Sequence, residues 1–208
     1  MVDNPIRMID PDGMAWVPGT DGQAVTYDEK TGWSANASEA TKTWGNSLMA
    51  VDNKGSMDRV LNSDIKTNII VSSDVKTETT SDGKIHTTFG DTKQGNDNAA
   101  DNYGRVVNSD GTYGIKEASI IIYDGSIKQE IKPGSGSKLE GLTETQAIGA
   151  VATHEDIHLK KGEINKDLHY EVAHQNDKIK VRPDKEVKAN QAEQKVIDAQ
   201  KKKNNPQQ

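Results

Sequence analysis

Two histidines four residues apart, with a glutamate directly after the first, are the residues of this sequence best suited to chemistry. They belong to the segment His154-Glu155-Asp156-Ile157-His158. On a helix, residues four apart share one face with their Cβ atoms about 5–6 Å apart, so both imidazoles can bind one metal ion. Glu155 lies one step round the helix, where its carboxylate can reach a water at that metal without being a ligand.

The chemistry that this spacing favours is zinc-assisted hydrolysis. Zn²⁺ lowers the pKa of a bound water to about 7 and polarises a carbonyl group. Glu155 would take the proton from that water and pass it to the leaving group. An H-E-x-x-H on a helix is typical of zinc metallopeptidases. The alternative is a charged helix end with two histidines that bind no metal, and it stays open because the bare pattern also arises by chance.

The residues around the motif predict the helix that it needs, from Thr143 to Gly162. The threonine and Gln146 match a capping box, and Glu144 suits the positive end of the helix dipole. Lys160 and Lys161 suit the last turn, and the glycine that follows them is typical of a residue just past a helix end. The turn before the motif is small and apolar, as we expect of a buried active-site helix.

The composition of the chain argues against several other classes of protein. With 208 residues, 32% hydrophobic and 4% aromatic, the chain predicts one domain with tails or two small ones, a modest core and some extended segments. The net charge of −6 argues against a nucleic-acid partner, because phosphate binding needs a basic face. The sequence has no cysteine, so a metal site must use His, Asp or Glu, and the chain fits the cytoplasm or export without disulfides. No run is long and apolar enough to span a membrane, and the N-terminus lacks the features of a signal peptide.

Hydrophobic periodicity and turn residues predict an α+β protein around the motif helix. The strongest strand is 117–123, which we expect near the site, whereas the polar residues 90–102 predict a mobile loop. A last helix, 185–200, follows Asp184, and residues 201–208 predict a disordered tail. The other expected elements are a hairpin at 24–33, helices at 34–51, 57–61 and 166–174, and strands at 66–73, 75–80 and 85–89.

A catalytic zinc commonly has three protein ligands and an open position, so one ligand must come from outside the motif helix. A third histidine at the spacing H-E-x-x-H-x-x-G-x-x-H is excluded, because position 164 is Ile164. That leaves a glutamate from a second helix. Four glutamates follow the motif as candidates: Glu163, Glu171, Glu186 and Glu193. Taken alone, residues 186–193 also fit an ordinary solvated helix face.

Residues 186–190, EVKAN, match the pattern E-x-x-A-[DN] that carries the third ligand in gluzincin metallopeptidases. Together with the motif at 154–158, they make the chain resemble that family. The resemblance implies a zincin-like α+β fold, with a small antiparallel or mixed sheet, the motif helix and a second, C-terminal ligand helix. It also implies that Glu186 binds the metal and that Asn190 hydrogen-bonds a ligand imidazole and fixes its tautomer.

The same resemblance implies the reaction. Zn²⁺ would be bound by His154, His158 and Glu186, Glu155 would activate the attacking water, and the substrate would be a protein or peptide. The oxyanion would be stabilised by a side chain from elsewhere. The sequence offers weak candidates directly after the motif: His169, Tyr170 and His174. His86, in the hairpin expected at 75–89, is more consistent with no role.

The N-terminal residues resemble a second family. Residues 4–13, NPIRMIDPDG, are similar to the signature that closes the core of Rhs/YD-repeat proteins of the Bacteroidetes type, although Met14 replaces the usual leucine. In that family the segment ends a large β-cage, and an aspartate-dependent self-cleavage releases a variable C-terminal toxin. The resemblance implies that Asp10 belongs to that cleavage machinery, that residues 1–22 end the core and that residues 23–200 form the toxin domain.

This second resemblance implies where the domain works. It would be secreted by one bacterium and delivered into a neighbouring cell, with the Rhs cage of the parent chain and a cognate immunity protein as partners. Neither nucleic acid nor membrane is expected as a partner. Two other interpretations stay open: a binding or structural module with a vestigial motif, and a toxin of another chemistry such as a histidine-dependent nuclease, against which the lack of a basic patch argues.

Overall fold

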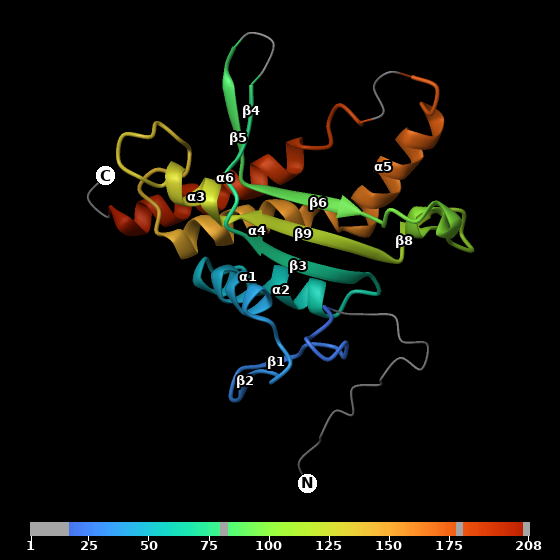
Figure 1. Ribbon diagram of the computed structural model, residues 1–208, viewed down its shortest axis with the longest axis horizontal. Helices are drawn as coiled ribbons and strands as arrows, with labels where there is room; N and C mark the ends of the chain where they lie inside the picture. Colours follow the sequence, from blue (N-terminus) through green and yellow to red (C-terminus); the bar gives the residue numbers. More distant parts are fainter. Residues whose placement is uncertain (1–16, 80–82, 178–180, 206–208) are drawn as a thin grey trace.

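The computed structural model describes residues 17–79, 83–177 and 181–205 (Figure 1). The segment that resembles the Rhs signature, including Asp10, lies outside the described residues. Within them, the chain forms a small mixed sheet with helices and short hairpins, which confirms the predicted α+β class. No helix in the described part of the chain has both the length and the apolar character needed to cross a membrane.

Helices precede and follow the sheet along the chain. They are α1 (Glu39–Ala50), α2 (Lys54–Leu61), α3 (Asp124–Glu130), α4 (Glu144–His158), α5 (Lys161–Ala173) and α6 (Val187–Asn204), with a 3-10 helix η1 (Ala99–Gly104). The central sheet consists of β3 (Lys66–Ser72), β6 (Gly90–Gln94) and β9 (Glu117–Tyr123). Three hairpins are separate from it: β1 (Tyr27–Asp28) with β2 (Gly32–Trp33), β4 (Lys76–Thr79) with β5 (Ile85–Thr88), and β7 (Arg105–Val107) with β8 (Tyr113–Ile115).

The central sheet has the order β3-β9-β6, with β9 parallel to β3 and antiparallel to β6. Successive side chains of a strand point to opposite faces, and the alternate residues Ala118, Ile120 and Ile122 of β9 are buried in the core. Helices α1 and α4 lie next to each other and contact this sheet, as Figure 1 shows. The strand expected at 117–123 is therefore confirmed, and it is the central strand of the sheet.

The residues predicted as a mobile loop, 90–102, instead contain the edge strand β6 and the start of η1. The prediction was wrong because β6 buries only one side chain, that of Thr92, so its sequence GDTKQ is polar and carries no strand pattern. Its conformation comes from pairing with β9, where Thr92 lies opposite Ile120. The free edge beside the motif helix thus belongs to β6, not to β9.

The motif helix α4 begins as predicted and ends earlier. The hydroxyl of Thr143 accepts a hydrogen bond from the main-chain N–H of Gln146, whose side chain accepts one from the N–H of Thr143, so the capping box is confirmed. However, α4 ends at His158, and Lys161 and Gly162 lie in the first turn of α5. The chain turns here because the next helix buries its own apolar residues, among them Ile164, in the core.

The folded domain includes a few more residues at each end than the sequence predicts. Val17 is fully buried in the core, and Pro18 pairs with Ala24, so the fold already includes residues that were expected to be a linker. At the other end, α6 continues to Asn204, into residues expected to be a disordered tail. Lys203 holds that end by an ion pair of 2.5 Å to Asp52.

Candidate metal centre

Small residues let α4 pack closely before it reaches its histidines. A Cβ at Gly149 would lie less than 3.0 Å from the main-chain oxygen of Ser47 in α1 and from the side chain of Val51. Three alanines of α4 are also fully buried: Ala147, Ala150 and Ala152. The close approach to α1 fixes the rotation of α4 about its own axis, and with it the face from which the motif projects.

Three side-chain atoms from two helices converge on that face. The Nε2 atoms of His154 and His158 lie 3.3 Å apart. The Oε2 atom of Glu186 lies 3.0 Å from Nε2 of His154 and 3.4 Å from Nε2 of His158. The three atoms form a nearly equilateral triangle. Of the glutamates that the sequence offers, Glu186 is therefore the one that reaches both imidazoles.

Packing of α6 against α4 brings Glu186 to this place. Ala189, Glu193 and Ile197 recur at helical spacing on the buried face of α6 that meets α4. Glu186 is the N-cap residue of α6, one turn before Ala189. Its side chain is 54% exposed, whereas that of His158 is 5% exposed. The triangle therefore has its glutamate on the solvent side and its histidines on the protein side.

Glu193 occupies a different position, behind the ring of His154. Its Oε2 atom lies 3.1 Å from Nδ1 of His154 and accepts a hydrogen bond of 2.7 Å from Lys138. The resemblance implied that Asn190 would hydrogen-bond a ligand imidazole, but its side chain is exposed and, among the described residues, makes no hydrogen bond to either histidine. Glu193, two turns beyond Glu186, takes that place because it lies on the buried face of α6.

The carboxylate of Glu155 is buried between α4 and β6, with the residue 4% exposed. Its Oε2 atom accepts a hydrogen bond of 2.8 Å from the hydroxyl of Thr92, which also lies 3.1 Å from the main-chain oxygen of Glu155. A Cβ at Gly90 would lie less than 3.0 Å from Oε1 of Glu155 and from the side chain of Val151. Only glycine at this position lets the strand approach the carboxylate so closely.

Burial and neighbouring charges change the pKa values of these groups. Burial raises the pKa of Glu155 to about 7, against the opposing effects of His154 and Thr92. For His154, burial lowers the pKa, but hydrogen bonds to Glu186 and Glu193 outweigh it and raise the pKa to about 9. Hydrogen bonds from the two histidines lower the pKa of Glu186. A carboxylate with a pKa near neutrality is suited to accept and release a proton.

The arrangement can hold a metal ion. His154, Glu155 and His158 each offer one ligand atom, and these atoms lie within 4.8 Å of one another. The Oε2 atom of Glu186 lies 3.0 Å from Nε2 of His154 and 3.4 Å from Nε2 of His158. One oxygen of Glu155 is already engaged by Thr92. We therefore regard Glu186 as the better third donor and Glu155 as the carboxylate beside the ion.

The other sequence candidates contact different partners. Glu163 binds Arg182 and Glu171 binds Arg105, so neither approaches the histidines. The His169 ring lies against Tyr113, and Tyr170 stacks on His174. His86 is on β5, opposite Glu78 in the projecting hairpin. In the described part of the chain, no hydrogen bond or ring contact joins His169, Tyr170 or His174 to the triangle, so the structure adds no support for an oxyanion role.

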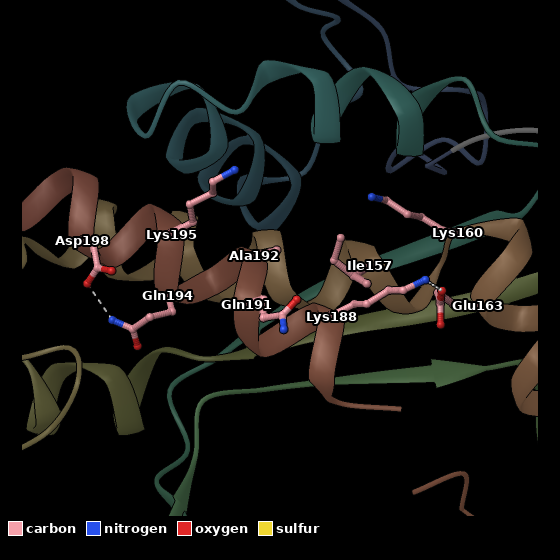
Figure 2. A pocket seen from close by; sticks show the side chains of 9 residues that line it. All are labelled: Ile157, Lys160, Glu163, Lys188, Gln191, Ala192, Gln194, Lys195 and Asp198. Atoms are coloured by element: carbon pink, nitrogen blue, oxygen red, sulfur yellow. Dashed lines mark hydrogen bonds and ion pairs between the residues drawn. The ribbon is translucent and has the colours of Figure 1, made fainter. Parts of the chain in front are cut away.

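Sequence reasoning missed two residues of the site, Thr92 and Lys138. Thr92 lies in a polar stretch without a strand pattern, and Lys138 in a glycine- and serine-rich segment, so neither carries a local signal. An open cleft of about 810 Å³ lies nearby, beside α6, and residues from α4, α5 and α6 line it (Figure 2). Neither histidine of the motif lines that cleft.

Comparisons of the chain with models of protein families, with curated proteins and with solved structures found no match.

Proposed function

We propose that this chain is a zinc-dependent metallopeptidase domain with His154, His158 and Glu186 as metal ligands. The observation that carries the proposal is the triangle of donor atoms with edges of 3.0, 3.3 and 3.4 Å. Tetrahedral zinc with ligand bonds of about 2.0–2.1 Å separates its ligand atoms by about 3.3–3.4 Å. Two neutral imidazoles and one carboxylate are also a donor set that catalytic zinc uses.

The remaining residues have roles that follow from their contacts. Zinc at this site would supply Lewis acidity, polarising a peptide carbonyl and acidifying a water. Glu155 takes the proton of the attacking water and donates it to the departing amine. Thr92 orients the Glu155 carboxylate through its hydrogen bond. Glu193 accepts from Nδ1–H of His154 and so keeps the lone pair of Nε2 directed at the metal.

The free edge of β6 favours an extended polypeptide as substrate. The carbonyl of Phe89 accepts from the N–H of Tyr123, and the N–H of Gly95 donates to Glu117, so the odd-numbered residues pair with β9. The main-chain groups of Gly90, Thr92 and Gln94 therefore point away from β9. In the described part of the chain no strand pairs with that edge. A substrate strand added there would lie next to Gly90 and Thr92, the residues of β6 that contact the Glu155 carboxylate.

We further propose that the domain is a toxin delivered into a neighbouring bacterial cell. The support is the similarity of residues 4–13 to the segment that closes Rhs cores, followed by a folded domain from Val17 onward. On this proposal Asp10 takes part in release from the Rhs cage, and a cognate immunity protein neutralises the domain in the producing cell.

The test is the pair Glu155→Gln and Glu144→Gln, the same chemical change at two positions of α4. Wild type is expected to contain about one zinc per chain and to cleave an unfolded polypeptide such as reduced, carboxymethylated α-lactalbumin. Glu155→Gln should retain the zinc and lose both cleavage and toxicity on expression, because the proton acceptor is gone. Glu144→Gln should behave as wild type. A Glu155→Gln protein that cleaves as fast as wild type would rule out the proposed base.

A further inference from the structure

Arg182 lies at the centre of a second cluster of charges, beyond the triangle. All three kinds of guanidinium nitrogen are engaged: Nη2 donates to Glu163 at 2.7 Å, Nε to Asp167 at 2.9 Å and Nη1 to Asp184 at 2.9 Å. The side chains of Arg182, Glu163 and Asp167 are each less than a tenth exposed. Because ion pairs with this geometry are directional, the cluster fixes the position of the backbone at residue 182.

Hydrogen bonds connect the same cluster to the motif helix α4 and to the edge strand β6. The side-chain amide of Gln94, in β6, donates 2.8 Å to the main-chain oxygen of His158 and 3.2 Å to Asp167. Asp167 and Glu163 are one turn apart on α5. The last residue of α4, the end of β6 and one face of α5 thus share one set of hydrogen bonds with Arg182.

A second anchor follows Glu186 along the chain. Lys188 reaches from the first turn of α6 to Oε1 of Glu163 at 2.5 Å, as Figure 2 shows. Glu163 therefore binds residue 182 through one oxygen and residue 188 through the other. Between these two anchors, Glu186 sits at an N-cap that makes no side-chain capping hydrogen bond, with its side chain half exposed. Nothing in its own turn of helix fixes its direction.

We propose that Arg182 is a positioning residue for the metal centre: through Glu163 and Asp167 it holds the segment that delivers the Glu186 carboxylate to His154 and His158. This inference rests on the proposed zinc site for its effect on the metal, but the positioning itself is a property of the chain alone. Holding the segment in place before the metal arrives removes the entropy cost of ordering a half-exposed glutamate.

The variant Arg182→Lys tests this, with Arg105→Lys as the matched control. Lysine keeps the positive charge but cannot bind three carboxylates with a planar fork. Arg105 is a suitable control because it also binds a carboxylate of α5, Glu171, at 2.7 and 2.8 Å, but among the described residues it makes no hydrogen bond or ion pair with the segment 182–188. Zinc affinity is measured by competition with a chromogenic chelator, and amide hydrogen exchange of residues 183–190 is measured in the metal-free proteins.

Arg182→Lys is expected to weaken zinc binding roughly 10- to 100-fold, the usual effect of losing a group that orients a ligand. It should also speed exchange across residues 183–190, while Arg105→Lys leaves both quantities at wild-type values. If Arg182→Lys does not fold, Lys188→Ala is the second variant, because Lys188 is the other anchor and its side chain is exposed. It should show the same loss of zinc affinity and the same faster exchange, each to a smaller extent.

The outcomes separate this inference from the proposed function. Unchanged exchange in Arg182→Lys overturns the positioning role, and so does faster exchange with unchanged zinc affinity. If wild type binds no zinc, the proposed metal centre fails, and the exchange comparison alone decides whether Arg182 holds the segment.

Discussion

Two clusters of carboxylates flank the start of α6, and they differ in how far neighbouring cations balance their negative charge. The cluster around Arg182 joins three carboxylates to four cations: Glu163, Asp167 and Asp184 with Lys166, Arg182, Lys185 and Lys188. The cluster around the motif has three carboxylates, two imidazoles and, among the contacts of the described residues, one lysine: Glu155, Glu186, Glu193, His154, His158 and Lys138.

The difference shows in which cluster the residues themselves balance the negative charge of the carboxylates. The Arg182 cluster has more cations than carboxylates among its own residues, so it needs no bound cation to balance its charge and serves to hold the chain. The motif cluster, with neutral imidazoles and ionised carboxylates, is short of two positive charges. A divalent cation would supply them. Without one, a proton on His154 compensates in part, in keeping with its pKa of about 9, which hydrogen bonds to two glutamates raise against burial.

The largest effect is expected from Glu186→Gln, which removes the charge of the proposed third ligand. Zinc affinity should fall on the order of a hundredfold or more, beyond the usual loss from a group outside the ligand set. Glu171→Gln is the matched control, because this glutamate was also a candidate from sequence and binds Arg105 instead. Calorimetric titration with zinc checks both. An equal loss in the two variants would contradict the choice of Glu186.

Gly90→Ala should reduce cleavage while leaving zinc in place. The added Cβ would lie less than 3.0 Å from the Glu155 carboxylate, and a displacement near 1 Å costs about a hundredfold in rate. Gly162→Ala is the control, because a Cβ there has no neighbour within 4 Å. Cleavage rates and zinc content of the two proteins are compared. Full activity in Gly90→Ala would mean that the approach of β6 to Glu155 is unimportant.

Glu193→Gln should weaken zinc binding by roughly 10-fold, because the carboxylate that fixes the His154 tautomer becomes a neutral amide. The comparison variant is Asn190→Ala, at the residue that the sequence favoured for this role. This variant should bind zinc as wild type does, since the Asn190 side chain is exposed. Chelator competition measures both affinities. A larger loss of zinc affinity in Asn190→Ala than in Glu193→Gln would instead support Asn190 as the residue that orients the imidazole.

Glu163→Gln should change stability in acid. Burial raises the pKa of Glu163, but hydrogen bonds from Lys188, Arg182 and Lys166 outweigh it and lower the pKa to about 2. A carboxylate with a depressed pKa stabilises the fold above its unfolded pKa, near 4.5, and loses that contribution as the pH falls towards 2. Because two of the lysines that bind it are half exposed, solvent screening limits this contribution to about 1–2 kcal/mol at neutral pH. Urea unfolding of both proteins between pH 7 and pH 3 should show the difference between them shrinking, and a constant difference would contradict this role.

Local signals in the sequence predicted the parts of the site that local structure determines. The capping box at Thr143 and Gln146 is encoded within one turn, and the structure contains it. The four-residue spacing of the histidines places them on one face of any helix, and their Nε2 atoms do meet. The pattern at 186–190 pointed to the glutamate that approaches both rings.

Tertiary packing determined what the sequence could not predict. Strand β6 has a polar sequence and exists because β9 offers an edge, so no periodicity indicated it. The end of α4 at His158 depends on burial of Ile164 in the following helix, which overrides the lysines and glycine typical of a helix C-terminus. Glu193 replaces Asn190 because the packing of α6 against α4 decides which side of α6 is buried.

The most direct test of the central claim is a crystal structure of the protein grown with zinc, with the metal located by anomalous scattering at the zinc edge. We expect one strong peak within about 2.0–2.2 Å of Nε2 of His154, Nε2 of His158 and a carboxylate oxygen of Glu186. Zinc bound elsewhere on the domain, or bound to the two histidines with Glu186 turned away into solvent, would contradict it.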